Sequence, residues 1–203
     1  ISFINTVADI CEKVGADVVK VAQGMGMDPR IGASFLKAGV GFGGYCLPKD
    51  IKAFSKIGED LNVDMSIFRA VTKVNENRFN TILDKVKNSL GVLDGKRAAI
   101  WGLAFKEGTD DIRESPCIPI IKSLVNHGMA VHLHDPEAKD IFKELIPPRP
   151  GSVDYFDSPE QAAVGVNVIL ITTEWEMYSR VNLSELKDIV KTPLLIDGRN
   201  MLD

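Results

Sequence analysis

Residues 39–50 have the residue types that covalent chemistry on a bound small molecule requires. They read Gly-Val-Gly-Phe-Gly-Gly-Tyr-Cys-Leu-Pro-Lys-Asp, with four glycines within six positions. Glycines permit positive φ angles and let a ligand contact main-chain N–H groups directly. Cys46 follows this run and Lys49 comes three positions later, which are the surroundings that a reactive thiolate needs. The pattern therefore predicts that Cys46 is a nucleophile.

A cysteine nucleophile in this setting suits the oxidation of an aldehyde. A thiolate adds to the aldehyde to give a thiohemiacetal, a hydride leaves to an acceptor, and water opens the resulting thioester. Asp50, one helical turn after Cys46, can orient or deprotonate that water. The alternative is a small buried thiol that happens to follow a glycine turn. Cys11, on an apolar helical face, and Cys117, in the first turn of a helix, fit that alternative and are expected to pack.

Composition excludes several classes of protein. The net charge of −4 argues against a nucleic-acid binder, and no apolar run approaches the length of a membrane-spanning helix. Three widely spaced cysteines do not suggest a disulfide framework, so a reducing, cytoplasmic setting is expected. The start has no basic leader of a signal peptide. It also lacks Met and opens within a helical pattern, so we expect a piece of a longer protein.

No motif has the spacing of a structural metal site, and none is predicted. Three histidines do lie within eight residues: His127, His132 and His134. Because His132 and His134 alternate with apolar residues, we interpret them as the polar face of a strand.

The first part of the chain, residues 1–93, is predicted to be all-helical. Apolar residues recur at helical spacing, with glycines or prolines at the boundaries. We expect helices at about 3–14, 17–24, 29–36, 48–60 and 65–90. A helix as long as the last is usually packed on both sides or shared between subunits.

From about residue 94 the pattern changes to alternating strands and helices. We expect strands at 97–105, 130–135, 166–173 and 194–197, and helices at 115–127, 136–145, 158–163 and 183–190, with Ser115 as an N-cap. Strands that are almost entirely apolar indicate a doubly wound parallel sheet, covered on both faces. Residues 94–203 are therefore predicted to form a Rossmann-like α/β domain. Ligands of such folds bind at the carboxyl ends of strands, here at 105–106, 172–175 and 197–200.

Two of these strand ends carry cations. Lys106 and Arg113 lie in the loop before a helix N-terminus, where an α/β sheet binds anions. A solvated loop is the alternative, because acidic residues balance both cations. Arg199 can hold a phosphate bidentately, although a surface arginine would have the same sequence context. No Gly-x-Gly-x-x-Gly follows a strand, so the chain shows no dinucleotide fingerprint.

Taken together, these segments resemble the UDP-glucose 6-dehydrogenase family, one of the nucleotide-sugar dehydrogenases. GDP-mannose enzymes share the Cys-Leu-Pro-Lys-Asp and Thr-Asp-Asp-x-Arg-Glu-Ser-Pro motifs and remain the closest alternative. Enzymes of the UDP-N-acetylmannosamine branch usually have a His beside the cysteine, which is absent here. The matching stretches are 11–18, 28–32, 35–50, 105–116 and 197–200.

The resemblance implies a three-part enzyme, of which this chain is the second half of the central domain and the C-terminal UDP-binding domain. NAD would be bound mainly by a Rossmann domain that is not in this chain. The intact enzyme would convert UDP-glucose to UDP-glucuronate by two hydride transfers, as a homodimer formed through the 65–90 helix. The chain alone is expected to be inactive, because hydride transfer needs a bound nicotinamide. A non-catalytic nucleotide-binding or dimerisation module is the other interpretation.

The resemblance also implies roles for individual residues. Cys46 would be the nucleophile and Asp50 the carboxylate that activates water. Arg113 would touch NAD from the C-terminal domain, and Tyr45 stands where the family usually has Ser. Substrate contacts are implied for Arg30, which would reach into the neighbouring subunit's site, and for Phe35, Leu36, Lys37, Gly39, Phe42, Gly43, Phe105, Lys106 and Arg199.

Overall fold

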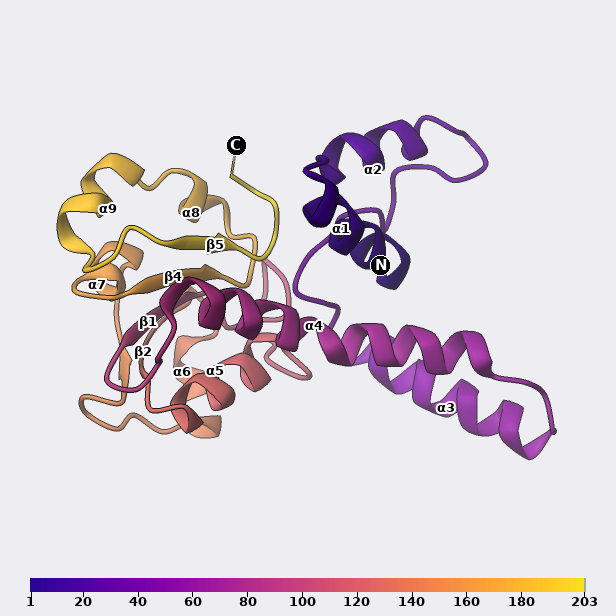
Figure 1. The fold of residues 1–203 in the computed structure, drawn as a ribbon. Coiled ribbons are helices and arrows are strands. Elements are labelled where there is room, and N and C mark those ends of the chain that lie inside the picture. The colour runs from indigo at the N-terminus through magenta and orange to yellow at the C-terminus, as the bar shows by residue number, and fades with distance from the viewer. Residues whose placement is uncertain (203) are drawn as a thin grey trace.

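The structure is a computed structural model that describes residues 1–202, and its first part consists of helices (Figure 1). Gly15, with φ 70°, ends α1, and the Asp17 side chain caps the start of α2 by accepting hydrogen bonds from two backbone N–H groups. The described part of residues 1–93 contains no strand, which confirms the all-helical prediction. The four helices are α1 (Ser2–Val14), α2 (Val18–Gly26), α3 (Cys46–Asp60) and α4 (Ser66–Leu90).

Helices α3 and α4 form a hairpin that projects from the body of the molecule (Figure 1). The rings of Phe54 and Phe68 pack at 5.1 Å between centroids. Gly58 faces Met65 so closely that a Cβ there would lie 2.1 Å from the Met65 sulfur. The second half of α4 leaves the hairpin and buries Ile82 and Val86 against the sheet. The predicted boundary near residue 94 falls just after this helix, in the loop that leads to β1.

Residues 94–202 form a five-stranded, all-parallel sheet in the order β3-β2-β1-β4-β5. The central strand β1 pairs with β2 on one side and with β4 on the other, so the chain winds in both directions from the middle of the sheet. This confirms the Rossmann-like, doubly wound prediction. The strands are β1 (Arg97–Trp101), β2 (Ala130–His134), β3 (Val153–Tyr155), β4 (Val168–Ile171) and β5 (Leu195–Asp197).

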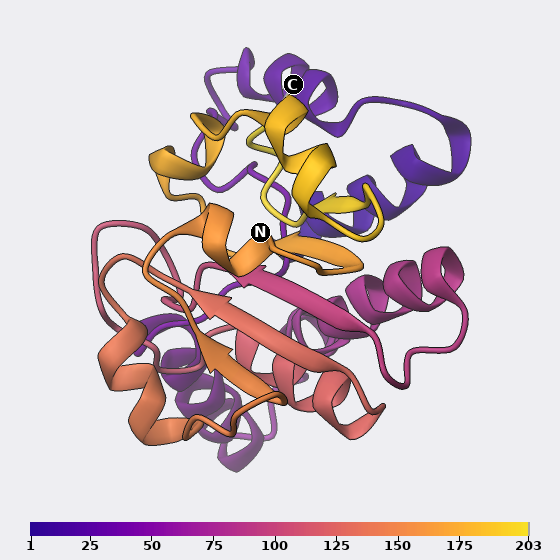
Figure 2. The same cartoon turned by 90° about the vertical axis from the view of Figure 1, so that its left-hand side faces the viewer.

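Helices cover both faces of the sheet (Figure 2). Ala98 and Ile100 of β1 point to the face that α4, α5 and α6 cover, and Ala99 and Trp101 point to the face that α7, α8 and α9 cover. This alternation explains why the strands contain so few polar residues. The helices are α5 (Cys117–Asn126), α6 (Lys139–Leu145), α7 (Pro159–Ala163), α8 (Glu176–Ser179) and α9 (Leu183–Ile189).

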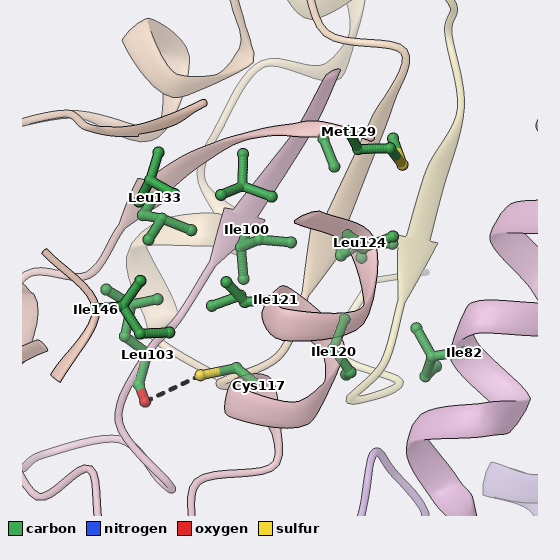
Figure 3. Packing of buried hydrophobic residues seen from close by; sticks show 14 of the residues in the cluster. Ile82, Ile100, Leu103, Cys117, Ile120, Ile121, Leu124, Met129, Leu133 and Ile146 are labelled. Carbon is green, nitrogen blue, oxygen red and sulfur yellow. Dashed lines mark hydrogen bonds between the residues drawn. The ribbon is translucent and has the colours of Figure 1, made fainter. Parts of the chain in front are cut away.

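Cys117 packs with the buried apolar residues on the face of the sheet that α4, α5 and α6 cover, as Figure 3 shows. Its thiol donates to the Leu103 carbonyl at 3.3 Å, and burial raises the pKa of the Cys117 thiol to about 12. Cys11 is buried on α1. Both cysteines pack in the interior, as the sequence predicts.

Three predicted elements differ from the structure for local reasons. Residues 29–36 form turns rather than a helix, because Gly32 (φ 72°) and Phe35 (φ 63°) adopt left-handed conformations. The first strand ends at Trp101 because the chain turns at Gly102 (φ 105°), where a Cβ would lie 2.4 Å from that of Thr173. Helix α5 begins at Cys117, and Ser115 does not cap it.

The short elements β3 and α8 were not predicted. The histidine prediction is half wrong, because His132 and His134 lie on β2 but are buried. His132 Nδ1 is 2.9 Å from the Ala162 carbonyl oxygen, and His134 Nδ1 is 3.0 Å from the Tyr178 hydroxyl. A strand covered on both faces has no solvent-facing polar side, so its polar residues need internal partners.

Candidate functional site

Arg199 joins the carboxyl ends of three strands. It follows β5, its Nε donates to the Thr172 carbonyl after β4 at 2.7 Å, and its Nη2 donates to the Phe105 carbonyl after β1 at 3.1 Å. Only 12% of the side chain is exposed. The three segments that the sequence singled out therefore meet at one guanidinium group. We call Arg199 and these contacts, with Glu174, the strand-end cluster.

Glu174 is a member of this cluster that the sequence analysis did not single out. Its Oε2 lies 3.0 Å from Arg199 Nε, so the two side chains form an ion pair. The angle does not suit a hydrogen bond, since the Nε–H points to Thr172, and this buried oxygen has no hydrogen-bond partner. Burial lowers the pKa of the Arg199 guanidinium, and the charge of Glu174 opposes that shift.

Asp135, at the end of β2, holds two of the same strand ends in place. Its Oδ2 accepts hydrogen bonds from the backbone N–H of Leu103 at 2.6 Å and from Trp175 Nε1 at 3.0 Å. Asp135 is fully buried, and its Oδ1 caps the chain before α6 by accepting from two backbone N–H groups. Asp135 therefore fixes the backbone that leads to Phe105. The sequence analysis missed this residue; an acidic residue directly after an apolar strand is the signal.

The glycine loop, residues 38–44, packs directly against these segments. A Cβ on Gly39 would lie 3.0 Å from the Gly198 carbonyl oxygen and 3.5 Å from Arg199 Cδ. A Cβ on Gly43 would lie 2.2 Å from the Glu114 carbonyl oxygen, and one on Gly44 would lie 2.7 Å from the Phe105 ring. The glycines thus allow one stretch of backbone to approach another.

Most of the loop's N–H groups are used inside the chain. Those of Val40 and Gly44 donate to the carbonyls of Gly198 and Arg113, at 2.9 and 2.8 Å. The N–H groups of Gly39 and Phe42 donate to side chains of the helices. For these four positions, the expectation that a ligand contacts the N–H groups directly is wrong.

Three polar side chains on α1 and α4 hold the glycine loop, and the sequence analysis missed them. Asn5 Oδ1 accepts from Gly39 N at 2.8 Å, and Arg78 Nε donates to the Gly39 carbonyl at 3.1 Å. Asn75 accepts from Phe42 N at 2.8 Å and donates to its carbonyl at 2.9 Å. Their signal is a polar residue among the apolar positions of a helix, which has to be satisfied when that face is buried.

Cys46 is exposed at the start of α3, unlike the two other cysteines. Asp50 lies four residues further along α3, so the two side chains lie on the same side of the helix. The Asp50 carboxylate is 3.2 Å from Lys49 Nζ and raises the pKa of that lysine. The Tyr45 ring is 4.6 Å from Lys49 Nζ and 4.6 Å from Arg113 Cζ. Cations from two segments therefore gather beside the residue that precedes the cysteine.

The remaining predicted residues lie around the cluster or away from it. Arg113 donates two hydrogen bonds to the Asp111 carboxylate, from Nε to Oδ1 at 2.9 Å and from Nη2 to Oδ2 at 2.7 Å. These bonds lower the pKa of the Asp111 carboxyl group. Lys106 is exposed, with Nζ 5.6 Å from the centre of the Phe105 ring. Phe42 lines a separate cavity of about 470 Å³ between α3, α4 and the start of α5.

Residues 30–37 do not join the strand-end cluster. Arg30 pairs with Asp28 at 2.6 Å and is exposed, as is Phe35. Leu36 packs against the small cluster of Ile4 and Ala8 on α1, and Lys37 lines a pocket beside α2. Of the predicted substrate contacts, the structure brings together Gly39, Gly43, Phe105, Arg199 and, at its edge, Lys106.

Within residues 1–202 there is no group of three or more His, Cys, Asp or Glu side chains that could hold a metal ion. The same residues include no helix long and apolar enough to cross a membrane. The turn after β1 has one glycine, Gly102, and a charged loop that includes Gly108 leads from it to α5.

Comparison with known proteins agrees with this architecture in both parts of the chain. Residues 1–77 match the central domain of the UDP-glucose/GDP-mannose dehydrogenase family, and residues 99–203 match its UDP binding domain. The UDP-glucose 6-dehydrogenase of Rickettsia conorii is 43% identical over 100% of this chain and 47% of its own length. A UDP-glucose 6-dehydrogenase of Bacillus subtilis is 42% identical over 98% of the chain and 45% of its own length.

Solved structures show the same similarity. A UDP-glucose dehydrogenase from Pyrobaculum islandicum superimposes with a TM-score of 0.90 at 34% identity, covering 99% of this chain and 44% of the other. An NDP-N-acetyl-D-galactosaminuronic acid dehydrogenase from Methanosarcina mazei gives 0.83 at 27% identity, covering 100% and 44%. The chain spans just under half the length of these relatives. On this evidence, the chain belongs to the UDP-glucose/GDP-mannose dehydrogenase family.

Proposed function

We propose that this chain is the substrate-binding and cysteine-bearing part of an NAD-dependent UDP-glucose 6-dehydrogenase. The observation that carries the proposal is the convergence of the strand-end cluster with the glycine loop, which leads directly into Cys46. An anion held near Arg199 and Lys106 would be the diphosphate of the substrate. The names of the relatives at 40–43% identity favour UDP-glucose as that substrate.

Cys46 and Asp50 would carry the covalent part of the oxidation. The Cys46 thiolate adds to the C6 aldehyde, forming the S–C bond of a thiohemiacetal, and loss of hydride from that carbon leaves a thioester. Asp50 takes a proton from the water that attacks the thioester, and the carboxylate product leaves as the thiolate is restored. The hydride of each oxidation would go to the nicotinamide that NAD supplies when it is bound. Arg113 would contact NAD from this chain, and we propose that a domain outside this chain binds most of the cofactor.

The same reasoning extends to the assembly and the setting of the protein. We propose a cytoplasmic homodimer formed through α4, with Arg30 reaching the partner's site. That role suits the side chain of Arg30, which is 87% exposed and remote from the strand-end cluster. We also propose a domain boundary near residue 94, with UDP held by the part that follows it.

Nucleotide binding tests the substrate half of this proposal. UDP should raise the melting temperature of the chain more than UMP or glucose does, because only UDP offers a diphosphate to Arg199 and Lys106. Ligand at 100 times its Kd stabilises the folded state by about 2.7 kcal/mol. Equal responses to the three ligands would contradict the proposal.

Two further assays separate the alternatives. A GDP-mannose enzyme would turn over GDP-mannose in preference to UDP-glucose when the intact parent is assayed. In a non-catalytic module the Cys46 thiol would not be activated, so it would be alkylated no faster than an ordinary exposed thiol. An activated Cys46 should react faster than Cys11 and Cys117 and faster than a cysteine introduced at the exposed position Ser179.

A further inference from the structure

Tyr45 lies between two cations that come from different parts of the chain. Lys49 Nζ is 4.6 Å from the centre of its ring and belongs to α3. Arg113 Cζ is also 4.6 Å from that centre and belongs to the loop between β1 and α5. Both distances are within the range of cation–π attraction, which is strongest toward the electron-rich face of an aromatic ring. The ring therefore links the start of α3, residues 45–50, which we call the cysteine turn, to the charged loop between β1 and α5.

Backbone contacts beside Tyr45 fix this arrangement. The N–H of Gly44 donates to the Arg113 carbonyl at 2.8 Å, and Gly43 lies against the Glu114 carbonyl. The start of α3 and the charged loop are thus held together at the residues next to the ring. The side chain at position 45 contacts that loop through Arg113, and it is aromatic.

Each cation around the ring has an acidic partner. On α3, Asp50 pairs with Lys49 at 3.2 Å; on the loop, Asp111 pairs with Arg113 at 2.7 Å. A further pair, Lys52 with Glu114 at 3.4 Å, joins the two elements. Asp50 and Asp111 are the main causes of the raised pKa values of Lys49 and Arg113, and negative charge on Cys46 contributes to both. Lys49 lies three residues after Cys46 at the start of α3, and Arg113 contacts the ring of the residue before Cys46.

We propose that Tyr45 is a positioning residue that holds Lys49 and Arg113 beside Cys46, where they stabilise negative charge on whatever the thiol attacks. The inference rests on the proposed function for its purpose. In that reaction the carbonyl oxygen gains negative charge as sulfur adds to the aldehyde, and the product is a carboxylate. The position thus has a role in charge placement that its half-exposed surface location conceals.

The test compares two alkylating reagents on Cys46 in the 203-residue chain. Iodoacetamide is neutral and iodoacetate is an anion, and in both cases the thiolate forms an S–C bond as iodide leaves. Their rate ratio cancels the intrinsic reactivity of the thiol and reports the local positive charge. Mass spectrometry assigns each product to Cys46.

The Tyr45→Leu variant, which keeps apolar bulk but has no aromatic face, should lower the iodoacetate-to-iodoacetamide ratio roughly threefold. Tyr45→Phe, which keeps the ring, should restore it to within about 1.3-fold of the parent. Leu47→Ala, an exposed neighbour on α3, is the matched control and should leave the ratio unchanged. An unchanged ratio in Tyr45→Leu, failure of Tyr45→Phe to restore it, or an equal fall in Leu47→Ala would overturn the inference.

The same measurements keep this inference separate from the proposed function. If the ratio does not depend on Tyr45 while Cys46 still reacts fast and UDP still stabilises the chain, only the role of Tyr45 is refuted. If Cys46 reacts no faster than the introduced cysteine and UDP has no effect, the proposed function fails. Tyr45 is 52% exposed, so these substitutions should leave the fold intact, which a melting curve checks.

Discussion

The strand-end cluster and the cysteine turn lie at the two ends of the glycine loop, but they are built differently. Arg199 is almost fully buried and bonded to two backbone carbonyls, whereas Cys46 is exposed and surrounded by charged side chains on the surface. Packing within the chain thus fixes the strand-end cluster, where we propose that the diphosphate binds, while exposed side chains form the surroundings of the thiol. Substitutions in the cluster should change stability and binding together, and those in the turn should change reactivity alone.

The largest expected effect follows from removing Arg199. The Arg199→Ala variant leaves the Thr172 and Phe105 carbonyls and the Glu174 carboxylate without their buried partner. We expect a loss of about 3–5 kcal/mol in the free energy of unfolding, measured by urea denaturation, and loss of UDP binding by calorimetry. Arg180→Ala, which removes an exposed pair with Glu176, should cost less than about 1 kcal/mol. Equal effects of the two substitutions would remove the distinction between buried and exposed regions.

A smaller effect is expected in the loop that joins the two regions. The Asn75→Ala variant removes two hydrogen bonds to the Phe42 backbone, which should lower the free energy of unfolding by about 1–3 kcal/mol. The Phe42 amide should also exchange its hydrogen faster, as NMR can show. Asn77→Ala, on the exposed side of the same helix, is the control and should change stability by less than about 0.5 kcal/mol. Unchanged exchange at Phe42 would mean that Asn75 does not protect this amide.

The smallest effect concerns the pH dependence of stability that arises from the two buried histidines of β2. Burial lowers the pKa values of His132 and His134, so the folded protein keeps them neutral while the unfolded chain binds protons below about pH 6.5. The stability that they contribute is present above that pH and is lost as the pH falls through it. We expect a decrease of up to about 1.3 kcal/mol per histidine between pH 7.5 and 5.5.

Urea denaturation at the two pH values tests this expectation. The decrease should be smaller in His134→Gln than in the parent, whereas His127→Gln, at an exposed position, should behave like the parent. A chain that becomes more stable as the pH falls would contradict the assignment of neutral, buried histidines.

Much of the fold was predictable because its causes are local in the sequence. The helical spacing of apolar residues in 65–90 and the nearly continuous apolar strands specify α4 and the parallel sheet. Residues 29–36 show the limit of prediction from local sequence, because a phenylalanine gives no indication that its φ angle is positive. The burial of His132 and His134 likewise depends on which helices cover the second face of the sheet.

The candidate site was predictable where a residue type is unusual for its position, as with Cys46 or with Arg199 after a strand. Asn75, Asp135 and Glu174 were missed because their importance lies in partners that are distant in sequence. Asn75 and Phe42, for example, are 33 residues apart. The glycines also have a role that the sequence did not indicate, because they admit neighbouring backbone and side chains, and the N–H groups of Gly39 and Gly44 bond within the chain.

The continuity of α4 has a structural consequence. One end of this helix is clamped by Phe54 and Phe68 in the projecting hairpin, and the other is embedded under the sheet through Ile82 and Val86. At about 1.5 Å per residue, this unbroken helix of 25 residues spans roughly 37 Å between the two regions. The projecting hairpin and the sheet domain that carries Arg199 are therefore joined by one continuous helix.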